Sequence, residues 1–318
     1  MIESFSYIKE NIPKWNIYDT THLMNKYLLE DILLDTKKLS ECIFEKSEGN
    51  PLYLTYIIKT LQSQGITLKI IESLPQYEFN LNSYYEYLTS LTDNNIVSVV
   101  LACLDFSVTR VELNQLIPFG FNFESNLKDL SPVIVENILR GGIRLYHGSF
   151  RRFNIEKFKT TANINEIYGK IVEWLEKQDF YENAKSYRHL LRYYIKIKEY
   201  EKIKKYASTD FLTKSLYNGY TEKTIKINYD NFLYVAKETL DWALFIYLSE
   251  INRTIYTTIS ENYNSEFLEN FELYFESVGL IYGFDRAYQM LYFDGEQNFN
   301  DLVTAKAFYI LDKYIDIL

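Results

Sequence analysis

The sequence predicts a mainly α-helical protein with one small β-hairpin, and three observations indicate this fold class. Apolar residues recur at helical spacing along most of the 318 residues. Two tetrapeptides, which begin at Ser83 and Thr109, have the spacing of helix-capping boxes. One glycine pair, Gly141-Gly142, stands between short apolar runs, which is typical of a hairpin turn. Hydrophobic residues make up 47% of the chain and charged residues 24%, so there is enough apolar material for a folded core.

Residues 1–80 are expected to form a small helical domain with a tight corner in it. The segment KSEGNPLYLTYIIKTL, residues 46–61, carries the evidence. Gly49 suits the left-handed residue that ends a helix, Asn50 suits the N-cap, and Pro51 suits the first helical position. Gly65 is expected to end the second helix, whose apolar face has the spacing i, i+3, i+4, i+7 and consists of Leu54, Ile57, Ile58 and Leu61.

Residues 81–160 show three helical patterns followed by the hairpin signal. The capping boxes predict helix starts at Ser83 and Thr109, and an apolar face from Ile96 to Leu104 lies between them. A third helix, interrupted at Ser131-Pro132, is predicted to carry an apolar set that comprises Leu127, Leu130, Val133, Ile134 and Ile138. Three helices followed by one hairpin is the order of a winged-helix domain.

Residues 161–318 show only helical patterns. Apolar and aromatic residues line one face from Ala184 to Tyr194, and long helical runs recur at 225–259, 264–282 and 302–317. Helix pairs of this kind stack into α-solenoids, similar to tetratricopeptide repeats, whose long concave surface binds other proteins. No strict period occurs here, so the prediction is a solenoid-like helical repeat domain.

The net charge of −9 is unevenly distributed along the chain. Residues 1–138 carry ten basic and eighteen acidic side chains, residues 139–205 carry sixteen and eight, and residues 206–318 carry eight and seventeen. The basic middle suits nucleic acid or an acidic partner, but pairing with the acidic ends of the same chain, or plain solvation, is the favoured interpretation.

Two absences indicate a cytoplasmic protein without a disulfide framework. No run of eighteen apolar residues occurs, and the first ten residues lack the pattern of an export signal. The two cysteines, Cys42 and Cys103, stand in apolar helical patterns and are interpreted as small buried hydrophobic residues.

No motif for catalysis, metal or nucleotide phosphate is complete. The nearest string to a phosphate loop, GYTEKT at 219–224, lacks the glycine directly before the lysine. G-x-S-x-G, H-E-x-x-H and C-x-x-C do not occur, and the three histidines and two cysteines form no local metal motif. The chain is therefore predicted not to be an enzyme and to hold no cofactor by itself.

Two groups of basic residues are candidates for an interaction. One is a stripe on a single predicted helix, which faces either phosphate or an acidic protein surface; a solvated outer face is the favoured alternative. Its members are Lys185, Arg188, Arg192 and Lys196, with His189 among them. The other group surrounds the hairpin and consists of Arg140, Arg144, Arg151 and Arg152.

DNA binding by the winged helix is disfavoured by charge. The third helix would have to enter a groove lined by phosphates, yet residues 124–139 carry Glu124, Asp129 and Glu136 against Lys128 alone. The arginines around the hairpin keep a DNA-binding regulator as the least favoured alternative.

Three stretches, in this order, resemble one protein family. SEGNPLYL, residues 47–54, resembles the G-x-P motif of STAND-class signalling ATPases, the group that includes NB-ARC and NACHT proteins. RLYHGSFRRF, residues 144–153, resembles the Met-His-Asp motif that ends the winged-helix domain of that family. EWLEKQDFYENAKSYRHLL, residues 173–191, looks like the start of the helical repeats in bacterial members. The resemblance covers the second half of the family and implies a helical lid-type domain at 1–80, a winged helix at 81–160 and helical repeats at 161–318.

The resemblance implies roles for two residues. Pro51 would pack on the adenine and His147 would reach the phosphate of ADP, while Gly148 stands where the family often has aspartate. The ATPase core with the phosphate loop is not in this sequence, so ADP or ATP would bind only if a core is supplied elsewhere.

The implied function is the non-catalytic regulatory and sensor part of a STAND-type ATPase, of the kind found in bacterial antiviral defence. Its helical repeats would recognise a protein ligand, and its other partners would be an ATPase core or further copies of itself. The alternative is a stand-alone helical-repeat module for protein interaction.

Overall fold

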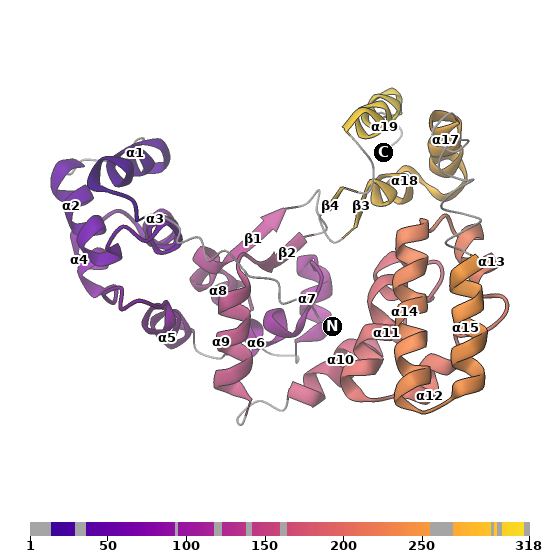
Figure 1. The fold of residues 1–318 in the computed structure, drawn as a ribbon. Helices are drawn as coiled ribbons and strands as arrows, with labels where there is room; N and C mark the ends of the chain where they lie inside the picture. The colour runs from indigo at the N-terminus through magenta and orange to yellow at the C-terminus, as the bar shows by residue number, and fades with distance from the viewer. Residues whose placement is uncertain are drawn as a thin grey trace, which may run out of the picture. The chain divides into compact units, whose positions relative to one another are not determined.

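The computed structural model describes most of the chain, and the described part is mainly α-helical (Figure 1). The described residues are 14–28, 36–92, 95–117, 123–137, 142–159, 164–254, 270–293, 296–297 and 301–314. They contain eighteen α-helices and two small antiparallel sheets of two strands each. The contacts divide the chain into two compact units, residues 1–162 and residues 163–318, called the first and the second unit below. The predicted fold class, mainly α-helical with a small hairpin, is confirmed.

The first unit begins with four helices that share an apolar core. α3 supplies the largest part of it, with Leu54, Ile57 and Leu61 fully buried against α1 and α2. The Lys46 ammonium group donates to the Leu74 carbonyl at 2.7 Å and so ties the end of α2 to the end of α4. The four helices are α1 (Ile17–Leu28), α2 (Thr36–Ser47), α3 (Pro51–Gln64) and α4 (Leu68–Ser73).

The corner between α2 and α3 is built as predicted. Gly49 has a φ of +70°, and a Cβ there would lie 2.1 Å from the Trp15 carbonyl oxygen, so a side chain is excluded both by conformation and by space. The Asn50 side-chain oxygen accepts from the Tyr53 N–H at 2.9 Å, and Pro51 is the first residue of α3.

Five helices, a 3₁₀ turn and a hairpin complete the first unit. In chain order they are α5 (Asn82–Leu91), α6 (Ile96–Cys103), α7 (Arg110–Leu116), α8 (Phe123–Asp129), η2 (Ser131–Val133), β1 (Ile134–Asn137), β2 (Gly142–Leu145) and α9 (Gly148–Phe158). β1 and β2 pair antiparallel, with Ile134 opposite Leu145 and Asn137 opposite Gly142.

A single bridge connects β2 to the segment before α7. Val108 and Ile143 pair antiparallel, and their amides and carbonyls exchange hydrogen bonds of 3.0 and 2.6 Å. Gly142, with a φ of +112°, permits this approach because a Cβ there would lie 2.3 Å from the Val108 carbonyl oxygen. The hairpin is therefore fixed to the helices at its second strand.

Two predicted helix boundaries are wrong and one is confirmed. Thr109 forms a complete capping box with Glu112 at the start of α7. Ser83 does not cap α5, because the Asn80 side chain accepts from the Asn82 N–H at 2.8 Å and the helix has already begun at Asn82. The predicted third helix ends at Asp129, and Ile134 lies on β1 rather than on a helix, since Pro132 interrupts the helical bonding and β-branched residues follow it.

α9 is attached to its neighbours at two points along its length. Arg151 Nη1 lies 3.0 Å from Asp105 Oδ1, just after α6, and Arg151 also donates to the Leu104 carbonyl. Near the other end, Lys157 is paired with Glu86 of α5 and donates to Thr89 Oγ1 at 3.1 Å. α9, the helix that follows the hairpin, is thus attached near its start through Arg151 and near its end through Lys157.

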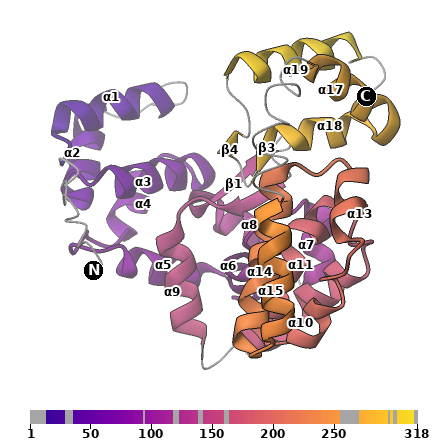
Figure 2. The ribbon, with the colours of Figure 1, turned by 45° about the vertical axis from the view of Figure 1, so that its right-hand side comes forward.

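The second unit consists of helices that pack in pairs (Figure 2). α11 packs on α10 and on α14, and α14 packs on α15; α17, α18 and α19 share a separate apolar cluster that includes Phe275 and Ala287. The helices are α10 (Ile164–Glu176), α11 (Ala184–Ile197), α12 (Tyr200–Lys204), α13 (Phe211–Tyr217), α14 (Glu222–Glu238), α15 (Trp242–Thr254), α17 (Phe271–Tyr282), α18 (Phe284–Leu291) and α19 (Asp301–Lys313). The second small sheet pairs β3 (Tyr292–Phe293) with β4 (Glu296–Gln297).

Aromatic residues fill much of the interior of the second unit. The rings of Tyr187 and Tyr220 stack with centroids 3.5 Å apart, and the Tyr187 hydroxyl donates to Ser215 Oγ at 2.7 Å. Of the two cysteines, Cys103 is buried as expected and Cys42 is only half-buried. Among the residues that the structure describes, none of the helices combines the length and the apolar character needed to cross a membrane.

Candidate functional site

His147 is the N-cap residue of α9 and its ring is exposed. Its Nδ1 atom accepts from the Ser149 N–H at 3.2 Å and lies 2.7 Å from Ser149 Oγ. Because Nδ1 accepts the bond from the amide, neutral His147 carries its proton on Nε2. The ring therefore offers an N–H donor on its far side, while its near side caps the helix.

Ser149 continues the hydrogen bonding into the interior of the first unit. Since Nδ1 of His147 carries no proton, the Ser149 hydroxyl donates to it and accepts in turn from the Tyr85 hydroxyl, 2.6 Å away. Tyr85 belongs to α5 and is almost fully buried. Burial raises the pKa of its phenol, opposed by the hydrogen bond to Ser149 and the charge of Arg152, so Tyr85 remains a neutral donor.

A cluster of four tyrosines, Tyr53, Tyr56, Tyr84 and Tyr85, connects this hydrogen-bonded chain to the corner at Pro51. Tyr53 and Tyr56 lie on the first turns of α3, which Pro51 begins. Their ring centroids are 5.0 and 5.5 Å from that of Tyr84, and Tyr56 also lies 6.2 Å from Tyr85. Burial raises the pKa of Tyr84 well above its usual value, which keeps this interior neutral. The two positions that the sequence singles out are thus joined through α5.

Lys59 of α3 forms a second connection. Its Nζ atom lies 4.2 Å from the ring centroid of Tyr146, the residue before His147. Partial burial lowers the pKa of Lys59. Lys59, Tyr85 and Ser149 were missed by sequence reasoning. Lys59 gave the only local signal, since it is the single charged residue in the apolar helix PLYLTYIIKTLQSQ.

The three described arginines around the hairpin differ in exposure and in their contacts. Arg140 lies outside the described residues, and Arg144 is half-buried on β2 opposite Val135. Arg151 is paired with Asp105, as described above, so it stabilises the packing of α9. Of these three described arginines only Arg152 is exposed, and it acts electrostatically on the Tyr85 phenol.

The acidic residues of the predicted third helix have a structural partner. Arg110 donates to both carboxylate oxygens of Glu136, at 2.8 and 2.7 Å, and is also paired with Glu124 of α8. The hydrogen bonds with Arg110 lower the pKa of Glu136. These carboxylates therefore pair with a neighbouring arginine of the first unit. The acidic Glu124 still leaves α8 without the basic face that contact with DNA phosphates would need.

The side chains of the basic stripe of α11 are half-buried. Arg188 Nη2 donates to the Gln289 carbonyl of α18 at 2.8 Å, and Lys196 Nζ lies 4.4 Å from the ring centroid of Tyr193. The stripe consists of Lys185, Arg188, Arg192 and Lys196. His189 between them is buried, and desolvation, with the nearby positive charges, holds its pKa well below the usual value. His189 is therefore a neutral core residue.

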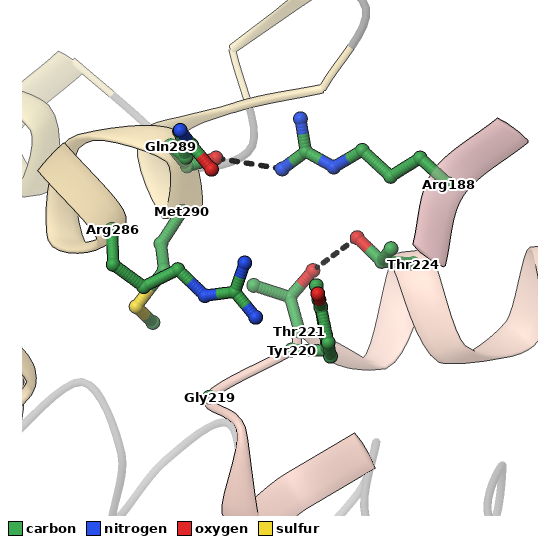
Figure 3. A pocket seen from close by; sticks show the side chains of 8 residues that line it. All are labelled: Arg188, Gly219, Tyr220, Thr221, Thr224, Arg286, Gln289 and Met290. Atoms are coloured by element: carbon green, nitrogen blue, oxygen red, sulfur yellow. Dashed lines mark hydrogen bonds between the residues drawn. The ribbon is translucent and has the colours of Figure 1, made fainter. Parts of the chain in front are cut away.

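The second unit contains a small pocket where the string GYTEKT begins α14 (Figure 3). Arg188 reaches it from α11 and Arg286 from α18, and the side chains of Thr221 and Thr224 also line it. Within the described residues, no three His, Cys, Asp or Glu side chains gather as a metal site would require.

Comparisons of this chain with protein-family models, with curated proteins and with solved structures find no match.

Proposed function

We propose that this chain is the non-catalytic regulatory and sensor part of a STAND-type signalling ATPase. The observation that carries the proposal is the physical connection between Pro51 and His147. α3, which Pro51 begins, packs through Tyr56 on Tyr85, and the Tyr85 hydroxyl is linked through Ser149 to the His147 ring. A lid-type corner and a nucleotide-sensing histidine need such a link, because the two must respond together to one ligand.

The order of elements in the first unit supports a lid followed by a winged helix. α1 to α4 form the small helical group that contains the corner. α6, the bridged residue Val108, α7, α8 and the hairpin then follow in the order helix, strand, helix, helix, strand, strand. The bridge joins Val108 to the second hairpin strand, as a three-stranded wing arrangement requires.

The chemistry around His147 suits a phosphate group. The exposed ring offers its Nε2–H, and Arg152 and Lys59 add positive charge nearby. Pro51 is half-buried and offers an apolar ring to a base. These residues would form one wall of an ADP or ATP site, and the wall with the phosphate loop would come from an ATPase core supplied elsewhere.

The paired helices of the second unit support a sensor role. α10 with α11 and α14 with α15 pack side by side, in the manner of solenoid repeats that bind proteins. We assign recognition of a protein ligand to this unit, in a defence or similar signalling response.

The test is the retention of ADP by an ATPase core. A separately produced STAND ATPase core is loaded with fluorescent ADP and mixed with the chain, and the rate of ADP loss is measured. The chain is expected to slow the loss by at least about tenfold, equivalent to one or more charge-assisted hydrogen bonds. His147→Asn keeps an N-cap acceptor but removes the Nε2–H, so it should abolish the slowing, and Pro51→Ala should weaken it.

The matched control is His22→Asn, because His22 is an exposed histidine on α1. This variant should retain ADP like the unmodified chain. If the chain leaves ADP loss unchanged, or if His147→Asn behaves as His22→Asn does, the nucleotide role is wrong. A chain that captures a protein through the second unit without any response to nucleotide is then a stand-alone interaction module.

A further inference from the structure

The pocket of the second unit has a positively charged lining. Two of its lining residues are arginines, and of the described residues that line it none is aspartate or glutamate. The pocket is open to solvent and far smaller than the pockets of roughly 300–1,000 Å³ that enclose drug-sized molecules, so it has room for no more than one small group of a larger ligand.

Arg286 is held in position before any ligand arrives. Its guanidinium lies 4.0 Å from the ring centroid of Tyr220, and its Nη2 donates to the Asn218 carbonyl at 2.9 Å and to the Tyr181 carbonyl at 3.4 Å. Within the described residues Arg286 has no carboxylate partner, and its hydrogen bonds to the Asn218 and Tyr181 carbonyls come from Nε and Nη2. Figure 3 shows the guanidinium extended from α18 toward Thr221. The group therefore has a fixed orientation with donors still available.

Arg188 approaches from the other side of the pocket. Its Nη2 donates to the Gln289 carbonyl at 2.8 Å, which fixes the guanidinium at the rim (Figure 3). Burial raises the pKa of the Tyr220 phenol, and the charges of Arg286 and Arg188 both oppose that rise. Both guanidiniums thus lie close enough to act electrostatically on one phenol, and, among the described residues, the guanidinium that an anion would meet with a free Nη1 is that of Arg286.

Two hydroxyl groups complete the lining. Thr221 Oγ1 and Thr224 Oγ1 are 3.0 Å apart and turn toward the pocket. Thr221 is the N-cap residue of α14, but its side chain makes no capping bond to the helix backbone. The GYTEKT string, which cannot close on a nucleotide as a phosphate loop does, therefore presents one free hydroxyl donor beside Arg286.

We infer that this pocket binds one oxyanion group, a carboxylate or a phosphoryl group, on an acidic segment of the protein ligand. Arg286 donates through Nη1, and the one threonine hydroxyl that does not donate to its neighbour donates to a second oxygen. The inference rests on the proposed function only for the statement that the ligand is a protein. The affinity of the pocket for an oxyanion does not depend on that proposal.

The experiment titrates the full chain with inorganic phosphate and, separately, with acetate at constant ionic strength. NMR follows the arginine Nε–Hε resonances, and the Arg286 resonance is identified by its loss in Arg286→Lys. A saturable shift of that resonance is expected. The ratio of the two affinities identifies the source, since tighter phosphate binding indicates a phosphoryl group and tighter or equal acetate binding indicates a carboxylate.

Three variants make the test specific, and the Nε–Hε resonance of Arg188, which also lines the pocket, reports on binding where Arg286 is absent. Arg286→Gln should weaken binding at least about tenfold, the value of one lost charge-assisted contact. Arg253→Gln removes the same charge from an arginine paired with Glu250 on α15 and should bind normally. Thr221→Val with Thr224→Val leaves both arginines in place, so it remains informative if Arg286→Gln does not fold, and should weaken binding several-fold.

An unsaturable response, or equal binding by the threonine variant and the unmodified chain, would overturn the inference. Arg286→Gln should leave the retention of ADP in the core experiment unchanged, so failure of the pocket and failure of the nucleotide role are distinguishable.

Discussion

The hydroxyl of Tyr85 lies 2.6 Å from Oγ of Ser149, and this bond joins two helices that are 64 positions apart in the chain. Ser149 belongs to the first turn of α9 and Tyr85 to the middle of α5, against which α3 packs. A change at the exposed His147 ring therefore has a defined route to the interior of the first unit.

Replacing Tyr85 with Phe tests the strength of this bond. Tyr85→Phe removes the hydroxyl and leaves Ser149 Oγ without that donor, so the free energy of unfolding should fall by about 1–2 kcal/mol in urea titrations. Tyr87→Phe is the control, because Tyr87 is a half-buried tyrosine of the same helix with no hydrogen bond from its hydroxyl to the described residues. Equal effects of the two substitutions would contradict the assigned role.

The helix-capping role of His147 can be separated from its contact with a ligand. His147→Ala removes the acceptor for the Ser149 N–H and should lower the free energy of unfolding by about 1 kcal/mol, whereas His147→Asn should change it by only a few tenths. Thermal or urea unfolding measures both variants. A His147→Asn chain as unstable as His147→Ala would show that the imidazole does more for the fold than cap α9.

Gly142 should not tolerate a side chain. Gly142→Ala must place a Cβ at a φ of +112° and 2.3 Å from the Val108 carbonyl oxygen, so we expect a loss of at least about 2 kcal/mol and a broken bridge. Gly148→Ala is the comparison, since a Cβ at that position meets no atom within 4 Å and the residue lies at the start of α9. Gly148→Ala should leave the free energy of unfolding unchanged or raise it slightly. The Ile143 amide, which donates to the Val108 carbonyl, should exchange faster in Gly142→Ala and at the usual rate in Gly148→Ala.

His189 should make the stability of the second unit depend on pH. Its pKa is depressed in the folded chain, so below the unfolded pKa of about 6.5 the unfolded state binds a proton that the folded state does not. The stability present at neutral pH is then lost as the pH falls, with a slope of up to about 1.4 kcal/mol per pH unit.

The measurement is urea unfolding between pH 7 and pH 5. His189→Gln should remove the contribution of His189 to the pH dependence of the free energy of unfolding, even if the substitution also changes that free energy at pH 7. His22→Gln, at an exposed position, should leave the slope unchanged. An unaltered slope in His189→Gln would assign the pH dependence to other groups.

Local chemistry made the corner at Gly49, Asn50 and Pro51 predictable, because each residue meets a requirement of the adjacent backbone alone. Ile134 was assigned to a helix because a short apolar run fits a strand or a buried helix equally well. Pairing with β2 makes this run a strand, and the sequence of the run alone does not show that pairing.

The candidate sites depend on contacts that sequence spacing cannot show. Tyr53, Tyr56, Tyr84 and Tyr85 follow no period that distinguishes them from the other tyrosines of the chain. The contact of Arg188 with the Gln289 carbonyl spans 101 positions, so the spacing of the stripe could not show it. Pairing of this kind is a property of the folded chain, so residue types can suggest a charged site but not its burial.

The two attachments of α9 have a mechanical consequence. α9 is the last helix of the first unit, and its ion pairs at Arg151 and Lys157 are spaced along its length on different neighbours. The two pairs join α9 to different parts of the first unit, so breaking either pair alone leaves the helix attached through the other. The capped end that carries His147 lies on the side of Arg151, so this end stays attached when the Lys157 pair is broken.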